Sequence, residues 1–156
     1  MVGNLIRLFE STATSFLDNG IGSLSDAISC MITEERNGEF ELEMDYPVNG
    51  IRYEEITQRR IIVAKPNKYD DPQPFRIYAI SKPINGVITI NAAHVSYDLT
   101  GYTVAPFTAT SASNAMTNLS NAIDESCPFT FITDKVVSAN LSIIKPLRDR
   151  DRKSVV

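Results

Sequence analysis

The sequence is poor in the residues that most enzymes use for metal binding and acid–base chemistry. Its 156 residues include no tryptophan, one histidine and two cysteines. His94 is the only imidazole, and Cys30 and Cys127 are far apart and form no CxxC motif, so the usual zinc ligand sets cannot be assembled. We predict two free thiols in a reducing compartment, with a single disulfide as the alternative. We expect no metal and no cofactor.

An excess of positive charge and a long apolar run are missing as well. The net charge is −4 and the pI is near 5.0, so the chain has no electrostatic footprint for nucleic acid or for an anionic membrane. No apolar run approaches the roughly 20 residues of a membrane-spanning helix. The N-terminus has no charged segment followed by an apolar one, so we expect neither a membrane span nor a signal peptide.

Motifs for nucleotide binding and nucleophilic catalysis are also missing. The sequence contains no GxGxxG, no GxxxxGK[ST] and no GxSxG. As a general base, His94 would have to serve Ser96, Ser29 or Cys127, and no motif supports any of these pairs. We therefore predict no catalytic and no cofactor-binding residue.

Acidic residues are plentiful, and one group of them alternates with apolar residues. Glu39, Glu41 and Glu43 could belong to a carboxylate-dependent hydrolase, as could the pairs 34–35 and 54–55. The simpler interpretation of the alternating group is the solvated face of a β-strand, where charge also opposes aggregation. Asp70 and Asp71 could bind calcium, but a loop is the simpler interpretation because few other oxygen ligands are nearby in sequence.

The abundant local pattern is that of β-hairpins. Asn-Gly occurs at positions 19–20, 37–38, 49–50 and 85–86, and both residues tolerate the positive φ of a two-residue type I′ turn. Around 37–38, residues 28–33 and 39–46 alternate with period two, which predicts a hairpin with one solvated face. One buried face is expected to hold four residues of the second strand: Phe40, Leu42, Met44 and Tyr46.

A second hairpin and two shorter strands complete the first predicted domain. Residues 74–81 and 87–97 flank the turn at 85–86, and the returning strand is rich in β-branched residues. Residues 60–64 and 5–9 are predicted strands. Five or six strands with short connections favour a small β-barrel or sandwich, which we predict as a β-barrel domain over residues 1–105.

The pattern changes after residue 105. An apolar stripe at helical spacing predicts a helix over 110–123, capped at its start by Thr110 or Ser111. Strands are predicted over 129–133 and 136–144, so residues 106–146 are expected to begin a second, incomplete barrel-like domain. The charged segment 147–156 is expected to be disordered. The predicted fold class is mainly β, a β-rich α+β chain with one helix.

Several segments resemble a known family. The main one is residues 33–47, TEERNGEFELEMDYP. It is similar to a hallmark segment of phage minor structural proteins, the prophage tail endopeptidase or tail-associated lysin family of long-tailed phages that infect Gram-positive bacteria. Five further segments resemble the family in the same order: 62–67, 74–78, 82–86, 93–99 and 104–107. The resemblance extends from Leu8 to about Arg148.

The resemblance implies an N-terminal region like the baseplate hub of contractile tails, with two related β-barrels in each subunit and six in a homotrimer. The implied partners are the distal tail protein and the tape-measure protein, and the implied location is the virion tail tip, after synthesis in the bacterial host cytoplasm. Peptidase and lysin modules of the family lie further along the chain and have no counterpart here, so no enzymatic activity is carried over. The sequence departs from the family pattern after Arg148.

Three hypotheses remain at this point. The first is a structural hub subunit. The second is a tail-tip module that binds a receptor or a cell-wall saccharide, which the lack of tryptophan disfavours. The third is a hydrolase that uses carboxylates or His94.

Overall fold

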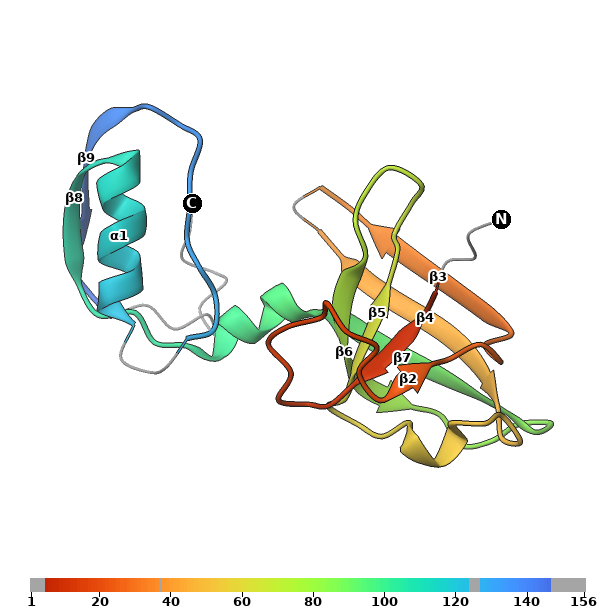
Figure 1. Cartoon of the computed structure of the whole chain (residues 1–156). Helices are drawn as coiled ribbons and strands as arrows, with labels where there is room; N and C mark the ends of the chain where they lie inside the picture. The colour runs from red at the N-terminus through yellow and green to blue at the C-terminus, as the bar shows by residue number, and fades with distance from the viewer. Residues whose placement is uncertain (1–4, 37, 124–126, 147–156) are drawn as a thin grey trace. The chain divides into compact units, whose positions relative to one another are not determined.

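The computed structural model describes residues 5–36, 38–123 and 127–146 (Figure 1). The chain divides into two compact units, which end and begin at Ser96 and Tyr97. The predicted boundary, at residues 105 and 106, lies further along the chain. The predicted disordered tail, 147–156, lies outside the described residues.

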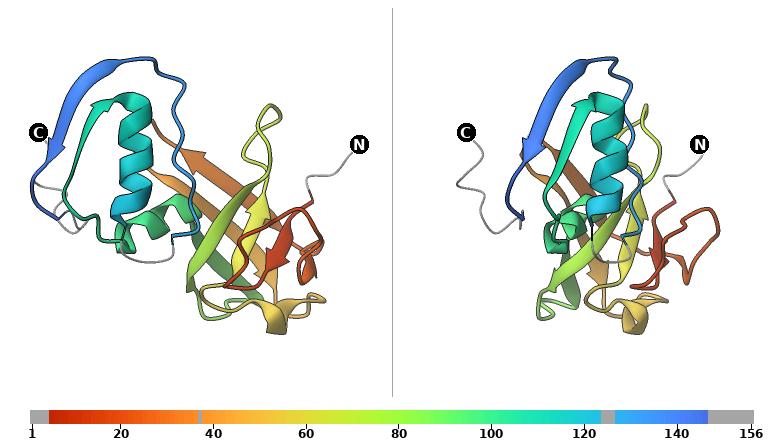
Figure 2. Two further views of the ribbon diagram at one scale, coloured as in Figure 1. Left: turned by 60° about the vertical axis from the view of Figure 1, so that its left-hand side comes forward. Right: turned by 90° about the vertical axis from the view of Figure 1, so that its left-hand side faces the viewer.

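A single antiparallel sheet forms the first unit. It has seven strands in the order β2-β1-β5-β6-β7-β4-β3 and curls into half a barrel (Figures 1 and 2). The fold class is mainly β, as predicted. The strands are β1 (Arg7–Phe9), β2 (Gly22–Ser23), β3 (Ser29–Glu34), β4 (Phe40–Pro47), β5 (Ile61–Ala64), β6 (Gln73–Ile80) and β7 (Val87–His94), with the 3-10 helix η1 (Tyr53–Glu55). A second 3-10 helix, η2 (Val95–Gly101), begins in the first unit and ends in the second.

The first predicted hairpin is confirmed as β3 and β4. Cys30 lies opposite Met44, and Ile32 lies opposite Leu42. The alternation of β4 orients its apolar side chains to the core, and Met44 is fully buried. The Glu35 amide donates to the Glu39 carbonyl at 2.7 Å and closes the loop. Asn37, half of the predicted Asn-Gly turn, lies outside the described residues.

The second predicted hairpin is confirmed as β6 and β7, and its turn has the expected chemistry. The returning strand ends at His94, so the predicted strand over residues 95–97 is wrong, and these residues begin η2. Asn85 and Gly86 both have positive φ, 52° and 77°. Ile84 and Val87 exchange backbone hydrogen bonds of 2.9 and 3.0 Å across them. These are the features of a type I′ turn, whose twist matches that of the flanking strands.

The concave side of the sheet holds the core of the first unit. Burial of these apolar side chains is the main stabilising contribution to the unit. Thirteen buried residues make up this core: Leu8, Leu24, Leu42, Met44, Tyr46, Ile56, Ile62, Ala64, Phe75, Ile77, Ile88, Ile90 and Ala92.

The second unit contains β8 (Phe107–Ser111), α1 (Ala112–Ala122) and β9 (Ser138–Ile143). β8 and β9 form a two-stranded antiparallel sheet. The helix is shorter than the predicted 110–123, because residues up to Ser111 pair with β9 as a strand. Ser111 is the N-cap, one of the two predicted, and its hydroxyl accepts from the Asn114 amide at 3.2 Å.

The two strands predicted after the helix have different outcomes. The predicted strand 136–144 is present as β9, slightly shortened. The predicted strand 129–133 is wrong, since those residues have no regular secondary structure. Their β-branched and aromatic side chains favour a strand, but a strand also needs a neighbour to bond with. In its place β8, which the sequence patterns did not predict, is the neighbour of β9.

Candidate functional site: the open edge of the seven-stranded sheet

Of the candidate nucleophiles, only Ser96 contacts His94. The Ser96 hydroxyl oxygen is 2.8 Å from Nδ1, and the Ser96 amide donates to the same nitrogen at 3.3 Å. Since an amide N–H can only donate, Nδ1 accepts, and Nε2 carries the proton and donates to Gln73 Oε1 at 3.2 Å. Burial lowers the pKa of His94, which favours this neutral form.

This arrangement stabilises the end of β7 and is not a catalytic triad. In a triad the base is oriented by a carboxylate, and here the amide of Gln73 takes that position. Of the other candidate partners, Ser29 donates to Asp45 at 3.1 Å, and Cys127 belongs to the second unit. In the described part of the chain, the geometry therefore offers no orienting carboxylate for a histidine-dependent hydrolase.

The alternating glutamates lie on the convex, solvated face of β4, as the strand interpretation predicted. Glu39 and Glu43 are exposed, and Glu41 accepts a 2.9 Å hydrogen bond from the Tyr78 hydroxyl. Partial burial, the bond to Glu41 and the negative charge of the glutamates raise the pKa of Tyr78. Burial is the largest of these causes, and the neighbouring glutamates add to it.

The remaining carboxylates have separate environments. Glu34 is exposed at the end of β3, and Glu55 forms an ion pair with Arg52 at 2.8 Å. Around Asp70, Asn67 Oδ1 accepts from two backbone amides at 2.8 and 3.0 Å, which stabilises a turn. Among residues 5–36, 38–123 and 127–146, no three His, Cys, Asp or Glu side chains are grouped to hold a metal ion.

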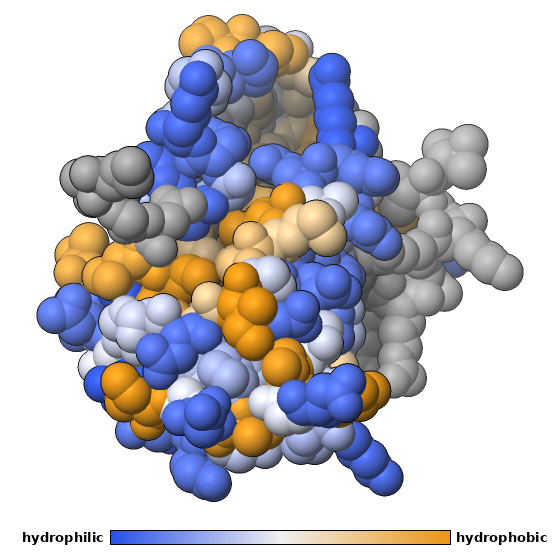
Figure 3. Space-filling view, turned by 90° about the vertical axis from the view of Figure 1, so that its right-hand side faces the viewer, coloured by the Kyte–Doolittle hydropathy of each residue, from blue (hydrophilic) through white to orange (hydrophobic). Residues whose placement is uncertain are grey.

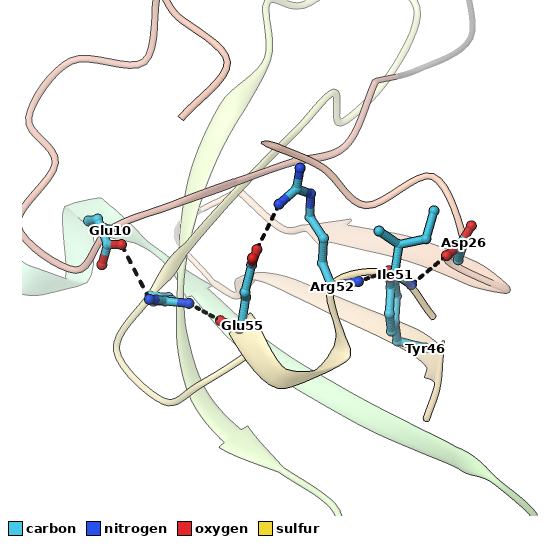
Figure 4. Close-up of polar contacts among 7 residues, drawn as sticks. Glu10, Asp26, Tyr46, Ile51, Arg52 and Glu55 are labelled. Atoms are coloured by element: carbon cyan, nitrogen blue, oxygen red, sulfur yellow. Dashed lines mark hydrogen bonds and ion pairs between the residues drawn. The ribbon is translucent and has the colours of Figure 1, made fainter. Parts of the chain in front are cut away.

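One polar cluster that sequence patterns did not predict joins β4 to the segments that follow β1, β2 and β4 (Figure 4). Arg60 bonds the Glu55 carbonyl oxygen and forms a 3.2 Å ion pair with Glu10. The Ile51 amide donates to Asp26 at 2.8 Å. The contacts of Arg60 with Glu10 and of Ile51 with Asp26 bridge segments that are distant in sequence, so no local pattern could have revealed them. The polar groups in these contacts are paired with one another, which is typical of a cluster that stabilises the fold.

The sheet ends in two strands of very different length. β2 has two residues, whereas β3 has six and, within the part of the chain that the structure describes, pairs with β4 alone. The side chain of Met31 is 60% exposed and Ile28, just before the strand, is 61% exposed. Such an edge leaves a row of backbone donors and acceptors open to pairing with another chain.

On the face that Figure 3 shows, apolar side chains form a band across the middle, and smaller apolar groups lie below it among polar side chains (Figure 3). The open edge of β3 is a separate feature, because its backbone groups can pair with another chain.

No family model, curated protein or solved structure matches the chain. None of the described helices has the length and apolar character needed to cross a lipid bilayer.

Proposed function

We propose that this chain is a structural subunit of the tail tip of a long-tailed phage or prophage, in which it forms part of the baseplate hub. The observation that carries the proposal is the ordered set of six segments that resemble phage minor structural proteins. The longest of them, residues 33–47, contains the end of β3, the connection to β4 and all of β4. In this proposal the protein joins the distal tail protein to the tip and has no catalytic role.

The positions of the segments in the fold support the proposal. Segments 62–67, 74–78 and 82–86 contribute to β5, β6 and the turn that follows β6. Together with β4 they belong to one sheet, so these segments lie in a packed structural unit and not in isolated loops. A hub subunit needs a stable core and open surfaces for its neighbours. The first unit has a buried core and a sheet edge formed by β3.

Features of the second unit also support the proposal that this protein assembles with other subunits. Its sheet has two strands, and a sheet of that size is only marginally stable in water without further packing. Among the described residues of this unit, the buried apolar ones are alanines, whereas five larger apolar residues are exposed: Ile132, Val136, Val137, Leu141 and Ile144. Contact with neighbouring subunits is one way to cover such residues.

Light scattering during size-exclusion chromatography tests the proposal. The chain has a mass of 17.3 kDa, so a homotrimer is expected at about 52 kDa, three times that value. A mixture with a hexameric distal tail protein is expected to elute as a complex. The proposal predicts the trimer, the complex, or both.

A monomer that forms no complex with the distal tail ring would contradict the hub proposal. In that event, a pull-down with purified cell walls of Gram-positive bacteria distinguishes the tail-tip binding module from the hub. Retention on cell walls that is lost after the saccharides are removed would identify the binding module.

A further inference from the structure

The backbone of β3 presents a definite set of groups to solvent. The Glu35 amide bonds the Glu39 carbonyl, and the register of β3 and β4 continues without a shift from that pair. In an antiparallel ladder, alternate residues bond the neighbour and the others turn away from it. The N–H and C=O groups of Cys30, Ile32 and Glu34 therefore point away from β4.

This edge lacks the features that normally keep sheet edges from pairing. Natural edges carry lysine, proline or a bulge, or are kept very short. β3 has six residues and contains neither lysine nor proline, and its pairing with β4 shows no bulge. The acidic row that was predicted to discourage aggregation lies on β4, one strand inside the edge. Only Glu34 carries charge on β3 itself.

The charge around the edge is strongly one-sided. Residues 34–43 contain five glutamates and one arginine. Glu41 and Glu43 lie opposite Thr33 and Met31, so all four side chains share the convex face. A strand added beside β3 would lie about 10 Å from β4, within reach of a lysine or arginine side chain.

On the concave side of the same edge, the apolar side chains are only partly covered by the core. Ile32 and Phe40 are partly buried against the core, and Cys30 faces the same side as Met44. An apolar side chain on an added strand would cover these residues further. The two faces of the edge thus differ. Glu41 and Glu43 lie on the convex face beside Met31, whereas the concave face has Cys30 and Ile32, with Glu34 at the end of the strand.

We propose that β3 is a docking edge for an extended segment of another protein, in which basic residues alternate with apolar ones. The segment adds an eighth strand to the sheet, with its basic side chains over Glu41 and Glu43 and its apolar side chains over Ile32. This mode of recognition combines backbone hydrogen bonds with alternating side-chain contacts. It does not depend on the hub function, since it follows from the edge and its charge.

A second copy of this chain fits the edge less well. It would bring an identical hairpin, with five glutamates and one arginine, against the first. Like charges on adjacent strands oppose association, and a basic partner removes that cost. Charge complementarity therefore selects a basic segment.

Two blocked synthetic peptides test the proposal on the intact chain. One alternates valine with lysine over seven residues and the other alternates valine with glutamate. Hydrogen exchange measured by NMR is expected to slow at the amides of Cys30, Ile32 and Glu34 when the lysine peptide is added. The glutamate peptide is expected to leave these rates unchanged. The effect should weaken as salt is raised.

Charge reversal on the convex face supplies the matched comparison. Glu43→Lys is expected to lower the association constant of the lysine peptide about three- to tenfold, and to raise that of the glutamate peptide. Glu54→Lys makes the same change at an exposed site in η1 and is expected to leave both constants unchanged. Unaltered exchange in β6 and β7 will show that both variants keep the fold.

Three results would overturn the proposal. The first is equal binding of the two peptides, and the second is binding without protection of the three outward amides. The third is protection of those amides by increasing concentration of the chain alone, which would assign the edge to a second copy. None of these results depends on whether the chain binds a distal tail protein, so the hub proposal is tested separately.

Discussion

The imidazole ring of His94 stacks on the phenyl ring of Phe40, with ring centroids 4.5 Å apart and planes inclined by 22°. Phe75 meets the same imidazole edge-on at 5.6 Å. The two aromatic rings shield the histidine from water, while Gln73 and Ser96 hold its two nitrogens in a neutral tautomer. The only histidine of the chain is therefore part of the packing at the end of β7.

This environment gives the stability of the first unit a dependence on pH. Burial lowers the pKa of His94 in the folded state below 6.5, so the unfolded state binds more protons between the two pKa values. Stability is therefore expected to fall as pH decreases through 6.5 towards the folded pKa. Urea denaturation at pH 7.5 and at pH 5.0 measures the change. His94→Gln should lose less stability over this interval, and an equal loss in both proteins would contradict the assignment.

The Cys30 thiol should react with thiol reagents more slowly than a fully exposed thiol does. Its side chain faces the concave side with Met44, and burial raises the pKa of the Cys30 thiol from 9.0 to about 11. In a Cys127→Ser variant, the rate of reaction with Ellman's reagent should keep rising with pH up to 10, because the thiolate is the nucleophile. In urea the rate should level off above about pH 9, the ordinary value for this thiol. The same pH profile in both conditions would show that the fold does not shield the sulfur.

Gly50 allows the chain to pass close to a buried tyrosine. A Cβ at this position would lie 2.4 Å from Cε1 of Tyr46, a side chain that is fully buried. We expect Gly50→Ala to lower the free energy of unfolding by about 1–3 kcal/mol, since the ring cannot move without disturbing the core. Chemical denaturation checks this. Gly101→Ala, where no atom lies within 4 Å of the added carbon, should change the stability by less than about 0.5 kcal/mol.

The hydroxyl of Ser111 caps α1, and its loss should weaken the second unit. Ser111→Ala removes the oxygen that accepts from the Asn114 amide and is expected to cost about 1 kcal/mol. Hydrogen exchange of the α1 amides should become about fivefold faster, the factor that corresponds to 1 kcal/mol. Ser113→Ala makes the same chemical change at an exposed position of the helix. If both variants exchange at the same rate, the cap does not stabilise the helix.

Local patterns predicted the hairpins well because each hairpin is determined by nearby residues. The alternation in β4 fixes which side chains are buried, and the Asn85–Gly86 pair fixes a two-residue turn. Ser111 was one of two predicted caps because a hydroxyl before an amphipathic helix can accept an orphan N–H. In each case the residues that interact are close in sequence.

Local sequence patterns predicted the strands of the second unit less well, because the partner of a strand there is distant in sequence. Residues 107–111 and 129–133 both contain residues that favour strands, and only the first pairs with β9. Propensity alone does not choose between them, because a strand is stabilised by its neighbour. The predicted helix also began too early, since residues 110 and 111 are taken up by β8.

For the candidate site, the sequence by itself determined the acidic face of β4, the strand character of β3 and the scarcity of catalytic groups. Only the tertiary structure decided that β3 ends the sheet and that the acidic strand lies one place inside it. It also gave His94 the aromatic neighbour Phe40 and the polar partner Gln73. The physical reason is that alternation along a strand specifies its two faces, whereas its neighbours are chosen by packing and hydrogen bonding between segments far apart in the chain.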